Sequence, residues 1–346
     1  MKHGLKMAGV ALAASGLLAG CGSTAAPTAT GSGSGTSAGG STSAAGAPAA
    51  STTYTMGPAI KPKDGKQLKI GVAFPILDQF LQNVADGIKK RAADAGVTVD
   101  IVSAEENAAT QLGQVENFVA QKVDGILIIP VDTDAAAPMT QKVTSANIPL
   151  AYVNRNPTGR PDGVPYVGSD SIVAGTLEMT ELAKQLNNKG NVAILIGDPA
   201  NEAAVQRTKG CKDVAQKVGM TVVLEQAGNW KRDKGLSITE NWLQSGKQID
   251  AICANNDEMA LGAIQALKNA NKLSSVKVGG VDATADALKA LKAGELAVTV
   301  FQDAKGQGAG GIDAIVQLYN KEKVPGFVNV PYQLVTKDKA DEFAAK

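Results

Sequence analysis

Histidine is almost absent from this sequence, since the only one is His3. Beyond it, no imidazole is available as the base of a Ser-His-Asp or Cys-His mechanism, and the commonest zinc ligand is missing. The 34 Lys and Arg residues nearly balance the 33 Asp and Glu residues, so the formal net charge is +1. A chain this close to neutral has no electrostatic footprint for nucleic acid. We therefore expect neither these enzymes nor a nucleic-acid-binding protein.

Apolar runs long enough to span a bilayer are also missing. The run near the start, residues 7–18, is too short for a membrane helix. Two lysines precede it and Leu18-Ala19-Gly20-Cys21 follows it, a pattern that predicts an export signal over residues 1–20. These last four residues resemble the lipobox of bacterial lipoproteins, which implies cleavage before Cys21 and a lipid on its thiol.

Charged side chains are missing from residues 22–60, which are mostly Gly, Ser, Thr, Ala and Pro. Such a composition cannot bury a hydrophobic core and is typical of a flexible linker. We expect a tether over residues 21–65, through which the lipid on Cys21 holds a soluble body near a membrane. The body itself is long enough for two domains.

Cysteine is scarce as well, with two residues besides Cys21. Cys211 lies in a helical stretch, and Cys253 lies in an apolar strand. Both are interpreted as small buried residues, and we expect no disulfide between them.

The body alternates short apolar runs with amphipathic stretches. Strands that alternate with helices predict parallel sheets with helices on both faces. The ten expected strands exceed one doubly wound sheet, so the predicted fold class is α/β with two doubly wound lobes. The expected strands are 68–74, 98–103, 125–130, 149–153, 164–168, 191–196, 221–226, 250–254, 276–281 and 298–302. The expected helices include 81–95, 111–122, 135–146, 171–188, 201–218, 258–270, 284–293 and 305–320.

Polar side chains follow several of these strands. In the clearest case, Asn255, Asn256 and Asp257 lie between an apolar strand and a helix. This carboxyl edge of an open parallel sheet is where ligands bind. A helix cap explains Asn256 or Asp257 equally well at one junction, but the arrangement recurs along the chain. The candidate site residues are Asp78, Phe80, Asn154, Arg155, Arg207, Trp230, Asn256, Asp282 and Gln302.

This set of side chains suits a polyhydroxyl ligand. Carboxylates, amides and Arg can hydrogen-bond pairs of hydroxyls, and the rings of Phe80 and Trp230 can cover apolar C–H faces. The set contains no activated nucleophile. A glycosidase that uses Asp78 and Asp282 as its carboxylate pair stays an alternative, because the sequence does not give the distance between them. Taken singly, Asp78 could be a helix cap, Phe80 a core residue and Arg207 a solvated helix residue.

A glycine motif raises the question of a nucleotide cofactor. Residues 306–311 fit G-x-G-x-x-G directly after an expected strand. A dinucleotide-binding unit should continue into another strand that ends in an acid, whereas here Lys321-Glu322-Lys323-Val324-Pro325 follows. We interpret the glycines as close packing or a hinge, and we expect no cofactor and no metal.

From about residue 68 to residue 343 the chain resembles the periplasmic sugar-binding proteins of ABC transporters. This type I class contains ribose-, glucose/galactose- and inositol-binding proteins. The resemblance is closest over residues 255–263, 280–282 and 299–304. It implies two lobes that close on a ligand by a hinge, and it implies ligand roles for the nine candidate residues.

The resemblance also implies where the lobes divide. Matching to the family places three crossing segments near residues 168–170, 302–303 and 323–325. The expected N-terminal lobe is then 66–169 plus 303–324, and the expected C-terminal lobe is 170–302 plus 325–346.

Three stretches, 152–157, 227–230 and 300–308, look most like inositol binders. Asn201 and Gln302 stand where the glucose/galactose type usually has His and Asn, and the turn 187–190 has no calcium ligand set. Ribose binders share Gln302 but have paired Phe residues where this chain has Phe80 alone. The favoured ligand is therefore a six-membered polyol ring, myo-inositol first, with a hexopyranose or ribose as alternatives.

The resemblance implies a binding protein and not an enzyme. It would work outside the cytoplasm, lipid-anchored or periplasmic, as a monomer that delivers its ligand to an ABC permease. A sensor for a membrane chemoreceptor is an alternative. A sugar-responsive repressor would need a helix-turn-helix where the signal and tether stand, and a secreted carbohydrate hydrolase would use Asp78 and Asp282.

Overall fold

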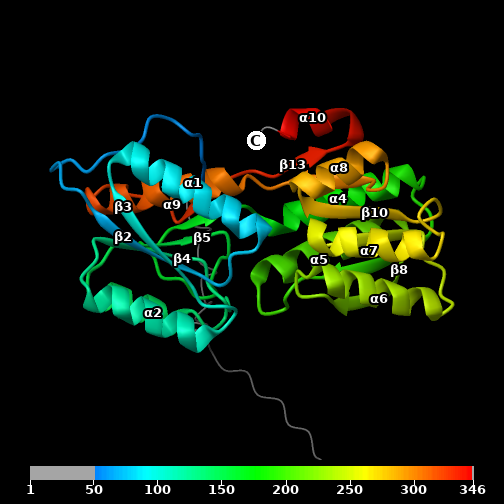
Figure 1. Cartoon of the computed structure of the whole chain (residues 1–346), viewed down its shortest axis with the longest axis horizontal. Coiled ribbons are helices and arrows are strands. Elements are labelled where there is room, and N and C mark those ends of the chain that lie inside the picture. Colours follow the sequence, from blue (N-terminus) through cyan, green and yellow to red (C-terminus); the bar gives the residue numbers. More distant parts are fainter. Residues whose placement is uncertain (1–50, 345–346) are drawn as a thin grey trace, which may run out of the picture. The chain divides into compact units, whose positions relative to one another are not determined.

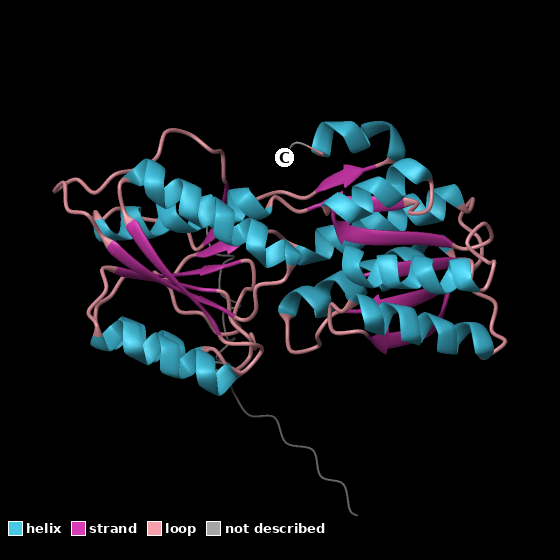
Figure 2. Cartoon of the chain, in the orientation of Figure 1, coloured by secondary structure: helices cyan, strands magenta, loops and turns pink. Residues whose placement is uncertain are grey.

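Two sheets of mainly parallel strands, each with helices on both faces, build two lobes (Figures 1 and 2). The computed structural model describes residues 51–344, and the contacts of the chain place Pro48–Lys346 in one unit. The expected export signal over residues 1–20 and the expected lipidation site Cys21 lie outside the described residues. The predicted α/β class with two doubly wound lobes is confirmed.

The N lobe contains a seven-stranded sheet in the order β1-β12-β6-β5-β4-β2-β3, with all neighbours parallel. Helices α1 and α9 cover one face, and α2 and α3 cover the other. The strands are β1 (Ser51–Thr53), β2 (Lys69–Phe74), β3 (Thr98–Ser103), β4 (Gly125–Ile128), β5 (Leu150–Val153), β6 (Tyr166–Gly168) and β12 (Phe327–Asn329). The helices are α1 (Gln79–Ala95), α2 (Ala108–Ala120), α3 (Ala137–Ser145) and α9 (Ala304–Tyr319).

The C lobe contains a six-stranded sheet in the order β13-β11-β10-β9-β7-β8. Helices α4 and α5 pack on one face, and α6, α7 and α8 pack on the other. The strands are β7 (Asn191–Ile196), β8 (Thr221–Ala227), β9 (Ala251–Ala254), β10 (Lys277–Asp282), β11 (Val298–Phe301) and β13 (Gln333–Val335). The helices are α4 (Ser171–Gln185), α5 (Glu202–Val218), α6 (Arg232–Gln244), α7 (Asp257–Asn269), α8 (Ala285–Ala293), α10 (Ala340–Phe343) and the 3₁₀ turn η1 (Lys337–Lys339).

The middle strands of each sheet are buried on both faces. β4 reads Gly-Ile-Leu-Ile and β9 reads Ala-Ile-Cys-Ala, and every residue of both strands is buried. Central strands of parallel sheets are continuous apolar runs because helices cover both of their faces. This property makes the central strands easy to recognise in the sequence. All ten expected strands are present, with ends that differ by no more than two residues.

Three strands were not predicted, and each has only three residues: β1, β12 and β13. Three residues are too few to show an alternating or continuous apolar pattern. The sheets are parallel as expected except at one edge, where β13 runs antiparallel to β11.

The glycine motif lies inside α9 and serves packing. A Cβ atom on Gly308 would lie 2.3 Å from the carbonyl oxygen of Val84 on α1. A Cβ atom on Gly87 of α1 would in turn lie 2.4 Å from the carbonyl oxygen of Lys305. Only glycine allows two helix backbones to approach this closely. The interpretation of these glycines as close packing is confirmed.

The chain passes between the lobes at three places: between β6 and α4, between β11 and α9, and between β12 and β13. The first two places coincide with the expected crossings near 168–170 and 302–303. The third crossing was expected near 323–325 and this is wrong, because β12 still pairs with β6 in the N-lobe sheet. The third crossing therefore lies at residues 330–332, and the expected lobe boundaries at 324 and 325 move with it.

The segment just before β2 packs on the N lobe. β1 pairs with β12, and the Tyr54 hydroxyl donates a hydrogen bond to Asp313 at 2.9 Å. Arg91, which forms a buried ion pair with Asp313, also donates to the carbonyl oxygens of Gly57 at 2.8 Å and Pro58 at 3.1 Å. The expected end of the tether at residue 65 is therefore wrong. This uncharged segment packs on the N lobe because Arg91 binds two of its carbonyl oxygens. None of the described helices is both long and apolar enough to cross a membrane.

Candidate ligand-binding cleft

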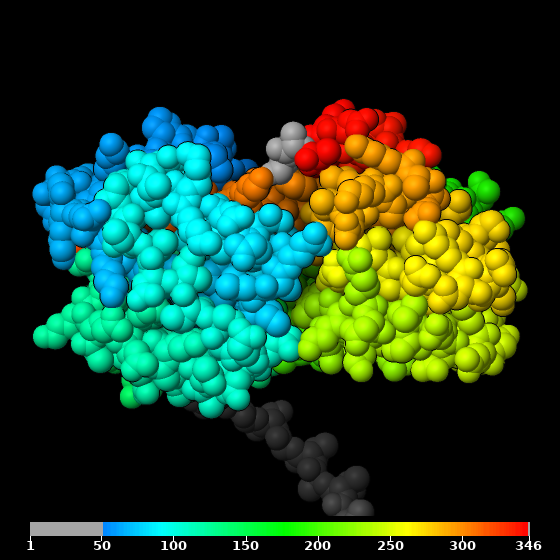
Figure 3. Space-filling model, viewed as in Figure 1, coloured from blue at the N-terminus to red at the C-terminus, as the bar shows by residue number. Residues whose placement is uncertain are grey.

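A narrow cavity lies where the carboxyl ends of the two sheets face each other. All nine candidate residues line it, four from the N lobe and five from the C lobe, together with Leu81 and Ala203. It encloses about 410 Å³ of atom-free space, part of which is open to solvent. Figure 3 shows the surface above it, where the blue and cyan part of the N lobe meets the yellow and green part of the C lobe. The fold thus brings the nine residues together, while their role as ligand contacts stays a prediction.

A wider groove opens from this cavity toward the surface. It shares Asp78, Arg155 and Trp230 with the cavity and continues over α6 and α7. Seven of its other fifteen lining residues are charged, and Lys231 of the C lobe pairs with Glu106 of the N lobe at 2.8 Å across it. The narrow cavity, which combines buried polar groups of the C lobe with polar groups of the N lobe, is the more selective of the two spaces.

On the N-lobe side, Asp78 and Phe80 begin helix α1. Asp78 is its N-cap, and its Oδ1 accepts a hydrogen bond from the backbone of Leu81 at 2.8 Å. Phe80 is half-buried and packs against the N-lobe core. Asp78 is thus a helix cap and Phe80 a core residue, and both side chains line the cavity as well.

Asn154 and Arg155 follow β5. Asn154 has a left-handed backbone with φ of 65°, a conformation that Asn tolerates better than most residues. Its Nδ2 donates to the side chain of Gln307 on α9 at 2.9 Å. Arg155 donates to the carbonyl oxygen of Pro130 at 3.0 Å, so this guanidinium is held by the loop after β4.

On the C-lobe side, Arg207 of α5 is the centre of a buried network. Only 4% of its surface is exposed, so it is not a solvated helix residue. It donates to the backbone oxygen of Asn255 at 2.7 Å, to Oε1 of Gln302 at 2.6 Å and to the hydroxyl of Tyr332 at 2.9 Å. Its Nε is buried and has no hydrogen-bond partner among the described residues.

Asp282 ends β10 with an unusual backbone. Its φ of 122° lies where side chains are rarely found, a strain that folded proteins concentrate at functional sites. Its carboxylate lies 3.9 Å from Arg207. Burial raises the pKa of Asp282 well above its usual range, although the Arg207 charge opposes this.

Asp257 is fully buried and supports the turn that follows Asp282. Its carboxylate accepts hydrogen bonds from the Thr284 backbone and from the Thr299 hydroxyl, both at 2.8 Å. Thr299 in turn accepts from the backbone of Ala283 at 3.2 Å, which holds the strained turn after Asp282. Burial raises the pKa of Asp257 to about 7.

Trp230 lies in the turn between β8 and α6. Its Nε1 donates to Oδ1 of Asn201 at 2.9 Å, and its indole lies 5.6 Å from the Arg207 guanidinium. Asn256 caps α7 by accepting from the backbone of Met259, and its Nδ2 donates to the backbone oxygen of Trp230 at 3.2 Å. The helix-cap reading of Asn256 is thus confirmed, and the same side chain faces the cavity.

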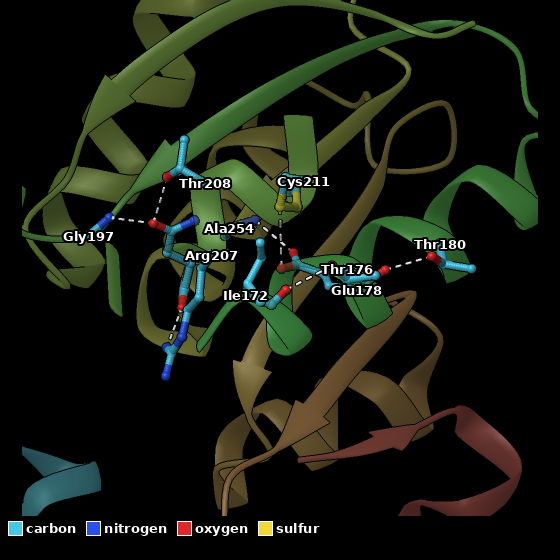
Figure 4. Close-up of a disulfide and its surroundings, with 11 residues drawn as sticks. Ile172, Thr176, Glu178, Thr180, Gly197, Arg207, Thr208, Cys211 and Ala254 are labelled. Atoms are coloured by element: carbon cyan, nitrogen blue, oxygen red, sulfur yellow. Dashed lines mark hydrogen bonds between the residues drawn. A yellow bond between two sulfur atoms is a disulfide. The ribbon is translucent and has the colours of Figure 1, made fainter. Parts of the chain in front are cut away.

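A disulfide joins Cys211 of α5 to Cys253 of β9, which contradicts our expectation. The burial expected of both residues is confirmed. Figure 4 shows the bond one turn from Arg207 and Thr208, beside Glu178, whose Oε1 accepts from the backbone of Ala254 at 2.8 Å. The pairing escapes the sequence because α5 and β9 come together only in the folded lobe. A disulfide here fits an oxidising compartment outside the cytoplasm.

Four supporting residues were missed as site residues. Asn255 accepts from the Gly197 backbone and the Thr208 hydroxyl, both at 3.0 Å, and Tyr332 reaches Arg207 from the third crossing. Asp257 and Asn201 support Asp282 and Trp230 as described. Asn255 and Asp257 were noted beside Asn256 at the end of the strand but were not included among the candidate site residues. The sequence marked Asn201 only as a departure from the glucose/galactose type, and it gave no sign of Tyr332, because the partners of both residues are distant along the chain.

Comparisons with known proteins agree with this geometry. Residues 70–323 match the model of the periplasmic binding protein domain family. A Rhizobium meliloti protein named for rhizopine binding is 43% identical over 286 residues, which cover 80% of this chain and 93% of that protein. The ribose import binding protein of Bacillus subtilis is 31% identical over 273 residues, which cover 78% and 88% of the two chains.

Solved structures lead to the same family. An ABC transporter solute-binding protein of Bacillus halodurans with bound myo-inositol is 44% identical, with a TM-score of 0.78 over 82% of this chain and 99% of that chain. The Caulobacter myo-inositol-binding protein is 28% identical, with a TM-score of 0.76 over 80% and 96% of the two chains. The chain therefore belongs to the periplasmic binding protein family, as a type I sugar-binding protein.

Proposed function

We propose that this protein captures a six-membered polyol ring between its lobes, myo-inositol first, and delivers it to an ABC permease in the membrane. The observation that carries the proposal is the convergence of nine polar and aromatic residues from both lobes on one narrow cavity. A ligand that touches both lobes is bound only when they are together, which is how a two-lobed receptor reports occupancy.

The chemistry of the cavity supports a ring rich in hydroxyl groups. Asp78 and Asp282 accept hydrogen bonds, Arg155 and Arg207 donate them, and the amides of Asn154, Asn256 and Gln302 do both. Phe80 comes from the N lobe and Trp230 from the C lobe, so each can cover one apolar face of the ring. A solute-binding protein at 44% identity holds myo-inositol, which supports our preference for this cyclitol over an aldose.

The cellular location is inferred from the family and from the lipobox-like residues at Cys21. Periplasmic binding proteins work outside the cytoplasm. We further propose that a lipid on Cys21 anchors the protein, that it acts as a monomer, and that residues between Cys21 and Ser51 link the anchor to the N lobe. A chemoreceptor is an alternative reader of the ligand-bound form.

Two alternatives remain for the ligand and the activity. Ribose or glucose would use the same carboxylates and amides, and ribose binders are among the relatives. A hydrolase would use Asp78 and Asp282 as a carboxylate pair. Against the hydrolase stand the binding proteins of the family and the helix-capping bond that Asp78 already makes.

The test is a thermal-shift and calorimetry panel with myo-inositol, ribose, glucose, galactose, xylose and arabinose. A ligand at about 100 times its dissociation constant should add about 2.7 kcal/mol to the free energy of unfolding. Asp282→Asn should abolish the response, whereas Asp213→Asn, an exposed acid on α5, should leave it unchanged. No response to any compound would refute the proposal. Turnover of a glycoside of the bound sugar would favour the hydrolase.

A further inference from the structure

Contacts between the two lobes are not confined to the three crossings. The loop between β4 and α3 touches the loop between β7 and α5. Thr133 donates through its backbone and its hydroxyl to the carbonyl oxygen of Ala200, both at 3.0 Å, and its hydroxyl accepts from the backbone of Glu202 at 3.2 Å. Beside them, Nδ2 of Asn201 donates to the carbonyl oxygen of Val131 at 3.0 Å. These contacts hold the lobes together on one side of the cleft.

Asn201 differs from the other residues of this contact, because its side chain also holds a wall of the cavity. Its Oδ1 accepts from Nε1 of Trp230 at 2.9 Å. The carbonyl oxygen of Val131, on the other side, lies 3.3 Å from the guanidinium of Arg155. One fully buried amide therefore connects a candidate ligand residue of the C lobe with the backbone that holds a candidate ligand residue of the N lobe.

An amide suits the chemistry of this position. The indole Nε1 can only donate and the Val131 carbonyl can only accept, so the side chain must offer one acceptor and one donor at once. The same two partners fix which end of the amide is oxygen. Asn201 stands at the N-cap position of α5 but makes no capping hydrogen bond, so its side chain is free for these two contacts.

The turn that carries Trp230 needs such support. Asn229 and Trp230 both have left-handed backbones, with φ of 51° and 66°. This conformation is unfavourable for a large side chain such as Trp. The indole also packs directly on Gly197, where a Cβ atom would lie 2.2 Å from its ring. The indole is thus fixed by Gly197 behind it and by Asn201 at its nitrogen.

We propose that Asn201 is a positioning residue that couples lobe closure to the orientation of Trp230, without itself touching the ligand. With the lobes together, the Val131 carbonyl fixes the amide, and the amide then fixes the indole as one face of the ring site. With the lobes apart, the amide loses one partner and holds the indole less firmly. This inference rests on the proposed polyol site, of which Trp230 is a wall.

Two substitutions of Asn201 separate its contacts. Asn201→Asp keeps an acceptor for Trp230 but, at a pH where its carboxyl is ionised, cannot donate to the Val131 carbonyl, whereas Asn201→Ala removes both contacts. Thr133→Val is the matched control, since it removes a hydroxyl from the same lobe contact and does not touch Trp230. Each variant is made in the full chain with Trp242→Phe, so that Trp230 is the only tryptophan.

Two readouts need no ligand. Small-angle scattering reports lobe separation, and the emission maximum with acrylamide quenching reports the position of the indole. We expect Asn201→Asp and Thr133→Val to increase lobe separation with little change in emission, and Asn201→Ala to change both. Asn201→Ala with unchanged emission, or Asn201→Asp with unchanged lobe separation, would overturn the proposal.

A third readout uses myo-inositol and calorimetry. We expect Asn201→Asp to weaken binding at least tenfold, and Thr133→Val to weaken it less. Trp230→Phe keeps a ring but lacks the indole nitrogen, so Asn201→Ala should cost less affinity in that background than in the parent. Equal costs in both backgrounds would contradict the coupling. If no polyol binds the parent chain, the proposed function fails, while the two ligand-free readouts still decide the role of Asn201.

Discussion

The indole of Trp230 packs directly on Gly197, and a Cβ atom at this position would lie 2.2 Å from the ring. Gly197→Ala should therefore push the indole into the cavity and weaken polyol binding about tenfold or more, with the fold retained. The measurement is titration calorimetry with circular dichroism as a check on folding. Gly113→Ala on α2 is the matched control, since nothing lies within 4 Å of its added carbon. Unchanged affinity in Gly197→Ala would show that the ring does not bound the ligand.

Arg207 pairs with Asp282 at the strained end of β10 and donates to three buried acceptors, on Asn255, Gln302 and Tyr332. Arg207→Met should lower the free energy of unfolding by about 3–5 kcal/mol, because it leaves these acceptors and the Asp282 carboxylate without a partner. Asp282→Asn added to Arg207→Met should recover part of the loss without restoring binding. Urea unfolding measures both changes. A double variant no more stable than the single one would mean that Asp282 places no charge beside Arg207.

Asp257 should make stability depend on pH. Burial raises its pKa to about 7, whereas the unfolded chain has a carboxyl with a pKa of about 4. Between these values the folded state binds more protons than the unfolded state, so the free energy of unfolding falls as pH rises through this window. Asp257→Asn cannot ionise and should flatten this fall, although Glu178 and Asp282 also have raised pKa values and leave some slope. Unfolding in urea from pH 4 to pH 8 provides the comparison, and identical slopes would exclude Asp257 as a source.

At the scale of elements, the disulfide connects α5, which carries Arg207, to β9, which leads into Asn256. A bridge across 42 residues should stabilise the fold by up to about 4 kcal/mol, because it restricts the unfolded chain. Replacing both cysteines by Ala, or reducing the parent during unfolding, should cost a similar free energy. The double variant should not respond to reductant. A parent that is equally stable with and without reductant would show that the bridge contributes nothing.

Elements differ in how far the sequence predicts them. Strands such as β4 and β9 are apolar throughout because they are buried on both faces, and this shows in the sequence alone. β12 has only Phe-Val-Asn, and its pairing with β6 depends on residues far away in the chain. The third crossing was therefore misplaced.

The site residues also differ in how far the sequence predicts them. Asp78, Asn154, Asn256 and Asp282 stand at strand ends or helix starts, where topology alone brings polar residues to one edge. Asn201 and Tyr332 act through partners that lie 29 and 125 residues away in the chain, Trp230 and Arg207. Pair contacts of this kind are not visible in one sequence.

At the scale of the whole molecule, Lys231 and Glu106 form an exposed ion pair between the lobes. Glu106→Lys should place like charges across the groove and weaken ligand binding several-fold at low salt, a modest effect because exposed pairs contribute up to about 1 kcal/mol. The exchanged pair, Glu106→Lys with Lys231→Glu, should restore affinity. Added salt should reduce the difference between the variants. Calorimetry at two salt concentrations tests this, and an exchanged pair that binds as weakly as the single variant would rule out a charge effect.

The pairing of β1 with β12 has a mechanical consequence. Any pull on the chain ahead of Ser51 enters the N lobe alone, since β1 and the carbonyls held by Arg91 all belong to it. A force along β1 acts in shear on hydrogen bonds that lie across the strands. The C lobe carries none of this load. It can therefore move toward the N lobe without doing work against the pulling force. A receptor held by its N-terminal side would thus close as freely under tension as at rest.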